Sequence, residues 1–370
     1  MISSLLSFLF KVFLFIFRAI RLVYDLACAT SVGFLFCVGV VIFVLSRYFR
    51  LKQPNLPPNL IDAIGGNQHI DSRQCSTGRQ QNLRCDSSDT IEWWPIANRA
   101  ACLDGVENSR SSIEKCVAQS CRYILLDVDI TKCGQLVILH EKTLHRLENE
   151  VPNGFDEASH KPQVSFSKIN SKKLDDLKSM NIAKNHPLCE KHPNEPILQF
   201  NDLMHLLDVH EKINIFLLMG STNKQIVSNI SRYFENNPER FKRIVVCSRS
   251  PKVIFQLRKQ NPQFICALWL DKVTKINLPS ILLNSTFFSF LYGLLYRNII
   301  AVLTGISAVF INKHDFNAHI GQMWRQSNIQ PIVYALNSPN EKRYFQHTLR
   351  TQYLTDSLRS EPSNFVKIRK

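Results

Sequence analysis

The stretch "IANRAACLDGVENSRSSIEKCVAQSCRYILLDVDITKCGQLVILHEKTLHRL", residues 96–147, places a short strand, a helix and a second strand in close succession. The run "PIAN" at 95–98 is short and apolar, and residues 109–119 have the spacing of an amphipathic helix. The run "RYILLDVD" at 122–129 is rich in aliphatic residues between polar turns, which is typical of a buried strand. This order predicts a βαβ unit.

The same alternation continues to the end of the chain and predicts an α/β fold, a (β/α)₈ TIM barrel over residues 93–362. Only the turn "TKCG" separates the run "LVILH" at 136–140 from the strand before it, and a parallel neighbour needs a much longer connection. We therefore predict a hairpin that brings His140 and Glu141 to the barrel mouth. The expected strands are 95–98, 122–129, 212–218, 243–247, 264–269, 307–312, 331–336 and 352–355, with helices including 109–119, 223–236, 250–258 and 339–349.

The part of the chain before the barrel predicts membrane attachment. Residues 26–46 are apolar and uncharged, and a helix of that length crosses a hydrocarbon core of roughly 30 Å. Residues 1–25 carry their polar side chains on one helical face, which predicts an interfacial helix or a shorter first span. Residues 47–92 are expected to be a polar linker, and residues 363–370 a basic tail.

Charge and modification patterns indicate a partner class and a compartment. The net charge of +15 is diffuse, which favours a solvated surface or attraction to anionic lipid over nucleic acid. Sequons at Asn229 and Asn284, with a Cys75–Cys85 disulfide, would fit a lumenal or extracellular barrel on an endomembrane or the plasma membrane. Basic residues flank 26–46 on both sides, so they give no orientation. As an alternative to further disulfides, most of the remaining cysteines, such as Cys116 and Cys247, are expected to be buried small hydrophobes.

A second apolar run, residues 281–296, is continued by 298–312 after Arg297. A membrane span at this point would separate the last strands from the first, which a closed barrel does not permit. Two interpretations remain. The run is either an insertion near the mouth that dips into the bilayer, or an amphipathic helix buried against the barrel.

Short motifs from Pro95 to Pro362 resemble those of the glycerophosphodiester phosphodiesterase family, in particular its membrane-anchored members. The family pattern His-Arg-Gly, Pro-Glu-Asn-Thr, Glu-Leu-Asp-Val, Thr-x-Asp-Gly and His-Asp corresponds here to "NRA", "VENS", "LLDV", "TKCG" and "HE". Later matches are "MG" at 219–220, "VVCS" at 245–248, "GISAVFINKHDF" at 305–316, "YALN" at 334–337 and "YLTDS" at 353–357.

The resemblance implies a Mg²⁺ or Ca²⁺ ion held by the two carboxylates of Glu-Leu-Asp and by an acid on the third strand. It also implies two histidines that act as general base and general acid. In this chain the base position is Asn98, the first metal ligand is Leu125 and the third-strand acid corresponds to Leu217. The nearby lysine corresponds to Met219. The family residues that remain are Arg99, Glu107, Asp127 and His140.

Two functions follow from this set of residues. The first is a membrane-tethered protein of lipid metabolism with impaired or absent catalysis and no metal cofactor, which binds an apolar or glycerophospholipid ligand or an unidentified protein. The second is an active, lysophospholipase D-like enzyme that hydrolyses glycerophosphodiesters or lysophospholipids. It would use Mg²⁺ or Ca²⁺ at an altered site of Asp127, Asp129 and Glu141.

The same residues also have structural interpretations. Asp129 is expected to pair with a lysine or arginine on the rim, and Glu141 to cap the following turn. Arg99 and Glu107 would pair and so link the first strand to the first helix. A buried Asp127 without a metal would need Arg99 as its partner, or a proton.

Overall fold

The computed structural model describes residues 94–148, 167–271 and 293–359 continuously, together with residues 46–57, 60, 361 and scattered positions between 17 and 44. The chain divides into two compact units, Met1–Arg50 and Leu51–Lys370. Among the described residues, no helix has both the length and the apolar character needed to cross a bilayer. Much of 1–46 lies outside the described residues, so the interfacial and transmembrane helices stay predictions.

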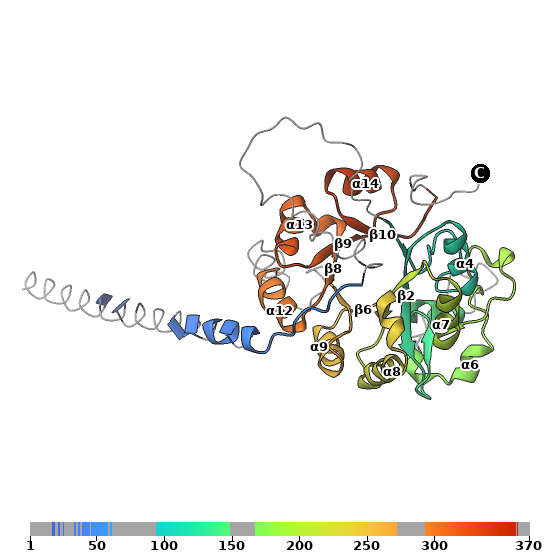
Figure 1. The fold of residues 1–370 in the computed structure, drawn as a ribbon, viewed down its shortest axis with the longest axis horizontal. Helices are drawn as coiled ribbons and strands as arrows, with labels where there is room; N and C mark the ends of the chain where they lie inside the picture. The colour runs from blue at the N-terminus through green and yellow to red at the C-terminus, as the bar shows by residue number, and fades with distance from the viewer. Residues whose placement is uncertain are drawn as a thin grey trace, which may run out of the picture. The chain divides into compact units, whose positions relative to one another are not determined.

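The second unit contains a closed barrel of eight parallel strands (Figure 1). Each strand pairs with its neighbour, and β1 pairs with both β2 and β10, which closes the ring. All eight begin and end within two residues of the predicted bounds, so the predicted (β/α)₈ fold is confirmed. The strands are β1 (Ile96–Asn98), β2 (Tyr123–Ile130), β5 (Asn214–Met219), β6 (Ile244–Ser248), β7 (Cys266–Trp269), β8 (Ala308–Asn312), β9 (Gln330–Tyr334) and β10 (Gln352–Thr355).

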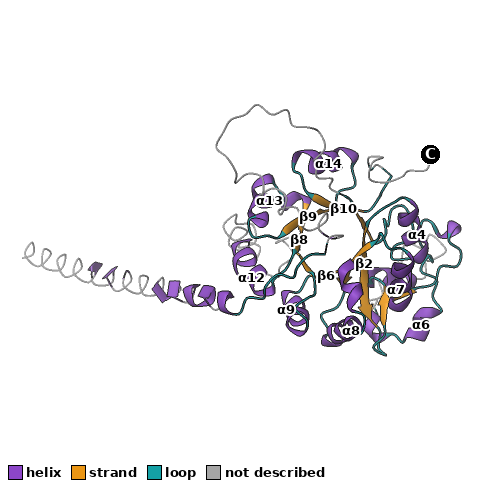
Figure 2. Ribbon diagram, in the orientation of Figure 1, coloured by secondary structure: helices purple, strands orange, loops and turns teal. Residues whose placement is uncertain are grey.

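Helices surround this ring of strands (Figure 2). Local capping explains where several of them begin, because the side chains of Ser109, Asn223 and Asn317 accept hydrogen bonds from the first turn of α4, α8 and α13. The helices are α4 (Arg110–Ala118), α7 (Phe200–Val209), α8 (Lys224–Glu235), α9 (Pro251–Gln260), α12 (Ala301–Thr304), α13 (Ala318–Arg325) and α14 (Pro339–Arg343), with π-helical turns at Tyr296–Ile300 and Tyr344–Thr348 and 3₁₀ turns at Pro238–Arg243 and Lys313–Asp315.

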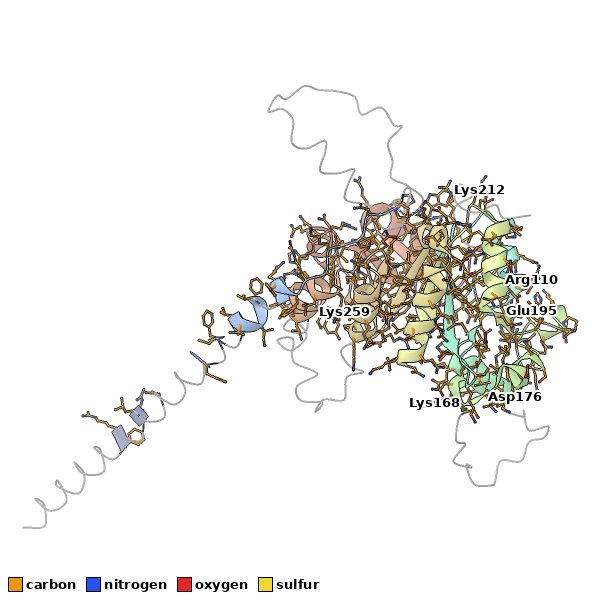
Figure 3. The ribbon with its side chains drawn as sticks, turned by 60° about the horizontal axis from the view of Figure 1, so that its bottom comes forward. Arg110, Lys168, Asp176, Glu195, Lys212 and Lys259 are labelled. Carbon is orange, nitrogen blue, oxygen red and sulfur yellow. The ribbon has the colours of Figure 1, made fainter. Side chains whose placement is uncertain are left out.

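A small subdomain, residues 136–148 and 167–199, projects from the carboxyl end of β2. Its strand β3 (Leu136–Ile138) pairs antiparallel with β2 and with β4 (Leu198–Gln199), which confirms the predicted hairpin. Val137, Leu144 and Leu177 belong to its own hydrophobic cluster. In Figure 3, Lys168 and Asp176 mark this subdomain, and Lys212, just before β5, lies at the opposite end. Its other elements are α5 (Glu141–Glu148), α6 (Leu174–Lys178) and the 3₁₀ turns Ile169–Ser171 and Cys189–Lys191.

The pairing register identifies the side chains that fill the barrel. Phe216 of β5 contacts Phe310 of β8, with ring centroids 6.0 Å apart, although these strands are not neighbours. Their rings therefore lie inside the barrel. The side chains of paired residues in a parallel sheet point to the same side of the sheet. The pairing register therefore identifies the interior residues of the other strands. Nearer the mouth, Trp269 stacks on Phe310 at 4.9 Å and on Tyr334 at 4.6 Å.

Residues 51–57 and Leu60, here called the strap, pack against the amino ends of the strands, which form the barrel base. The Leu51 N–H donates to Leu303 O at 3.3 Å, and the buried Arg258 guanidinium donates to Lys52 O. Gly305 (φ 58°) lies so close that a Cβ there would be 2.5 Å from Leu51 O. Leu60 has no exposed surface. This part of the predicted linker is thus integrated into the barrel.

The predicted modification sites are mostly outside the described residues, including Asn284, Cys75 and Cys85. Asn229 is on α8, where its amide donates to Gly134 O at 2.6 Å, and a glycan on that nitrogen would disrupt the bond. Cys116 and Cys247 are buried, as predicted. The apolar run 281–296 is largely outside the described residues, whereas 298–312 forms the end of a helical segment and β8.

Candidate functional site at the barrel mouth

Asp127 is the centre of the site, and an arginine neutralises it. The residue is 1% exposed on β2. Its Oδ2 accepts from Arg99 Nε at 2.8 Å and from Asn108 Nδ2 at 3.0 Å. The Asp127 N–H in turn donates to Asn108 Oδ1 at 3.1 Å. The structure thus brings together Arg99 and Asp127, the partner that the sequence analysis expected for this carboxylate.

The turn that carries Arg99 has a strained backbone. Arg99, Ala100 and Ala101 have φ values of 49°, 61° and 60°, and Asn108 has 56°. The left-handed conformation costs roughly 1–2 kcal/mol for each residue with a Cβ. In the motif quoted above, the position of Ala100 is a glycine. The Asn108 N–H donates to Arg99 O at 3.1 Å, so Asn108 supports both this turn and Asp127. Asn108 lies in the "VENS" motif, but the sequence pattern alone did not mark it as a site residue.

Leucines occupy the interior positions beside Asp127. Leu125 precedes it by two residues on β2 and shares its face. On β5, the partner of Asp127 is Leu218, while Leu217 pairs with Leu126. The interior third-strand residue is therefore Leu218, whereas Leu217, which the motif matches to the family acid, faces outward. Met219 pairs with Val128 and shares the outward face of Leu217. Neither interior leucine offers an oxygen to a cation.

Asn98 is fixed to the last strand. Its Nδ2 donates to Asp356 Oδ1 at 2.6 Å. Asp356 also accepts from Asn337 Nδ2 at 2.8 Å and from the Cys102 thiol at 3.4 Å. Burial, with Asp356 adding to it, raises the pKa of Cys102 to about 12, so this thiol stays protonated. An amide does not take up a proton at neutral pH, and Asn98 serves here as a link between β1 and the end of β10.

His140 follows β3 and lies at the mouth, as predicted. Its Nδ1 accepts from the Lys142 N–H at 3.1 Å, so the neutral ring carries its proton on Nε2. Burial lowers the pKa of His140; Asp127 opposes this effect, and Arg99 adds to it. These interactions place the imidazole within electrostatic range of the Arg99–Asp127 pair. The ring is therefore a neutral N–H donor at physiological pH.

Glu107 does not pair with Arg99, so the expected link between the two is wrong. Its Oε1 accepts from Arg146 Nη2 at 2.7 Å and from Thr143 Oγ1 at 3.0 Å, and its Oε2 lies 3.2 Å from His186 Nε2. Burial is the largest effect and tends to raise the pKa of Glu107, but the charge and hydrogen bond of Arg146, with a backbone N–H and Thr143, together lower the net pKa. Glu107 therefore anchors the mouth subdomain to the barrel.

Asp129 and Glu141 complete the predicted set. Asp129 Oδ1 accepts from the Ile130 N–H at 2.8 Å, and burial raises its pKa, with Glu141 and Asp127 contributing. Within the described residues, no lysine or arginine forms the expected ion pair with Asp129. Gly220 makes room for its carboxylate, because a Cβ there would be 2.8 Å from Oδ2. Glu141 is the exposed first residue of α5.

The comparison with known families agrees with this fold and motif order. The sequence model of the "Glycerophosphoryl diester phosphodiesterase family" matches residues 95–357. The chain belongs to this family. "Glycerophosphodiester phosphodiesterase 1" of Homo sapiens is 26% identical over 275 residues, which cover 71% of this chain and 77% of that protein. The protein of the same name from Rattus norvegicus is 25% identical over 272 residues, with the same coverage.

Solved structures of family members share the fold. A glycerophosphodiester phosphodiesterase from Agrobacterium tumefaciens superposes with a TM-score of 0.53 at 13% identity, over 72% of this chain and 96% of that chain. A phosphodiesterase from Oleispira antarctica, in complex with the product sn-glycerol-3-phosphate, gives a TM-score of 0.52 at 13% identity, over 72% and 94%.

Enzymes of this family commonly use divalent metals, but the residues at this mouth do not fit such an ion. Mg²⁺ and Ca²⁺ require about six to eight oxygen ligands, of which carboxylates are the usual protein contribution. Across the described residues, no three His, Cys, Asp or Glu side chains converge as a metal site. Asp127 already has a cationic partner, and the raised pKa of Asp129 reflects a poorly solvated carboxylate. The side chains at the mouth can bind a ligand through hydrogen bonds and apolar contacts.

Proposed function

We propose that this chain is a catalytically impaired member of the glycerophosphodiester phosphodiesterase family that binds a lipid ligand at the barrel mouth. The observation that carries the proposal is the pairing of Asp127 with Arg99 and Asn108, with Leu125 and Leu218 as its interior neighbours. In this arrangement the guanidinium takes the role of counter-charge that a cation would otherwise have.

Chemical reasons support the loss of hydrolysis. Phosphodiester cleavage by general acid–base catalysis needs one group that takes up a proton and another that gives one back. Asn98 supplies neither, because its amide has no titration near neutral pH and donates to Asp356. His140 alone retains a titratable nitrogen. The remaining polar groups can orient a phosphate ester, and the neighbouring leucines and Trp269 favour apolar parts of a ligand.

A membrane location belongs to the same proposal. We infer that residues 26–46 tether the barrel, on the lumenal or extracellular side of an endomembrane or of the plasma membrane. The support is the uncharged apolar run and the resemblance to membrane-anchored members. A glycerophospholipid or lysophospholipid in such a membrane would be the available ligand.

An active phosphodiesterase with an altered metal site is the second candidate. The observation that favours it is electrostatic proximity: Glu141 and Asp127 both raise the pKa of Asp129, so three carboxylates share one region. The names of the mammalian relatives describe an enzyme of this type.

A metal titration of the full-length protein tests both candidates. We expect calorimetry to detect no specific binding of Mg²⁺ or Ca²⁺. We also expect that no glycerol phosphate is released from glycerophosphodiesters. Micromolar metal affinity that disappears in Asp127→Asn would support the second candidate instead. A lysophospholipid titration in detergent tests the ligand class, with Leu218→Glu as the variant expected to weaken binding and the exposed Leu103→Glu as its matched control.

Restoring the missing groups tests whether their absence accounts for the loss of metal binding. The variant Asn98→His/Leu125→Glu/Leu218→Glu should regain metal binding, because it returns a base and two carboxylates to interior positions around Asp127. The single changes should achieve little, since the groups act as a unit. A folded triple variant with no metal affinity would show that Arg99 keeps Asp127 from serving as a ligand. Adding Arg99→Gln to it would then be the next comparison.

A further inference from the structure

Two buried glutamines face the interior of the barrel near its base. Gln330 of β9 is 2% exposed and Gln352 of β10 is fully buried. Ile332 pairs with both Phe310 and Gln352, and Gln330 lies two residues before Ile332 on the same strand. All of these side chains therefore share the interior face that Phe310 defines. The two glutamines are therefore diagonal neighbours on the same face of adjacent strands.

Three polar atoms of this pair have no hydrogen-bond partner among the described residues: Gln330 Nε2, Gln330 Oε1 and Gln352 Oε1. The fourth, Gln352 Nε2, donates to Trp94 O. Buried polar groups in folded proteins are nearly always paired, either with protein or with ordered water, because an unpaired amide gives up its hydration without compensation. Such a concentration of orphaned atoms at one place requires a ligand.

The surroundings separate this place from bulk solvent. On the mouth side, the rings of Phe216 and Phe310 fill the barrel. On the base side, the strap passes beneath the same strands, because Gln53 Nε2 donates to Ile306 O at 2.8 Å and to Asn328 O at 3.2 Å. Ile306 and Asn328 lie two residues before the starts of β8 and β9. A ligand here must therefore be small.

We propose that the barrel base holds a structural water molecule shared by Gln330 and Gln352. A water molecule donates two hydrogen bonds and accepts at least one, and buried waters typically make about three. The three orphaned atoms are two carbonyl oxygens and one N–H, which match those capacities. The water would join β9 to β10 across the interior, at a layer where other TIM barrels commonly use branched apolar side chains.

A double-mutant cycle on the full-length chain tests this water. Gln330→Met keeps the volume of the side chain but removes its polar atoms, so the water loses two of its three hydrogen bonds and keeps only the one to Gln352. We expect a roughly tenfold loss in the folding equilibrium constant, measured by urea unfolding. Gln352→Met should then cost less in the Gln330→Met background than in the wild type, since the shared water has already been lost. Gln322→Met, on the exposed face of α13, is the control and should change nothing.

Each outcome decides the proposal. An increase in stability for Gln330→Met, or additive effects of the two substitutions, would mean that the glutamines do not share a water. If Gln330→Met fails to fold, recovery of folding in the double variant would support the shared water, and continued failure would contradict it. A crystal structure gives a direct test: we expect density within about 3.2 Å of all three orphaned atoms. Ordered glutamines with no density between them would overturn the proposal.

Discussion

Replacing Arg99 with methionine should destabilise the barrel substantially, because it removes the cation beside a carboxylate that is 1% exposed. Breaking a buried ion pair from one side costs about 3–5 kcal/mol. The Arg99 side chain is 26% exposed, so water can partly solvate Asp127 after the substitution. We therefore expect a loss of about 2–4 kcal/mol, lower than for a fully buried pair. Methionine retains most of the apolar stem, so little packing is lost.

Urea unfolding of Arg99→Met, Asp127→Asn and the double variant measures the coupling. The double variant should be about as stable as Asp127→Asn alone, because the arginine has no buried charge left to compensate. Arg110→Met is the matched control, since its ion pair with Glu114 is exposed and should contribute less than about 1 kcal/mol. The reasoning is refuted if Arg99→Met costs no more than Arg110→Met. Recovery of its stability by added Mg²⁺ would instead identify Asp127 as a metal ligand.

Three further outcomes are expected. Deleting residues 1–60 should destabilise the barrel by about 2–4 kcal/mol relative to deleting 1–50. The longer deletion removes the buried Leu60 side chain and the Lys52 carbonyl that accepts from Arg258. Equal urea midpoints of the two variants would contradict this. Ser120→Gly should stabilise by about 0.5–1 kcal/mol, because this exposed residue ends α4 with φ 61°; an unchanged or lower melting temperature would count against it. Glu107→Gln should lose stability at neutral pH. The pKa of Glu107 is lowered, so its contribution is present above the unfolded value of about 4.3 and is lost as pH falls through the folded value. Unfolding of the variant from about pH 3 to pH 7 should show a flatter acid limb, and a limb as steep as in the wild type would argue against the Arg146 pair.

The barrel could be predicted because its strands are continuous apolar runs, separated by segments with the spacing of amphipathic helices. That pattern does not depend on which residues occupy the site. The same property hides which residue of the third strand faces the interior. "NIFLLM", residues 214–219, is buried on both faces, so its sequence has no alternation that separates interior from exterior residues. The family motif pointed to Leu217, whereas the inter-strand pairing places Leu218 on the interior face.

The partners of the charged residues depended on contacts that sequence patterns do not contain. Arg99 and Glu107 are close in sequence, which made their pairing attractive. In the structure, however, Glu107 pairs with Arg146 and His186 of the mouth subdomain. Arg99 pairs with Asp127 instead. The strap was also unexpected: "LKQPNLP" at 51–57 has the composition of a linker, and its fit to the base depends on Gly305 and Arg258 far along the chain.

The closure of the barrel by β1 and β10 has a consequence for biosynthesis. Ile96 pairs with Leu354, and Asn98 bonds to Asp356 across 258 positions of sequence. At a translation rate of about 5–20 residues per second, the first strand emerges roughly 13–50 seconds before its last partner exists. During that interval one edge of β1 has no strand to pair with, and the ring stays open at that seam. A nascent chain of this protein therefore depends on chaperones or on its early βα units to protect that edge until the final strand is made.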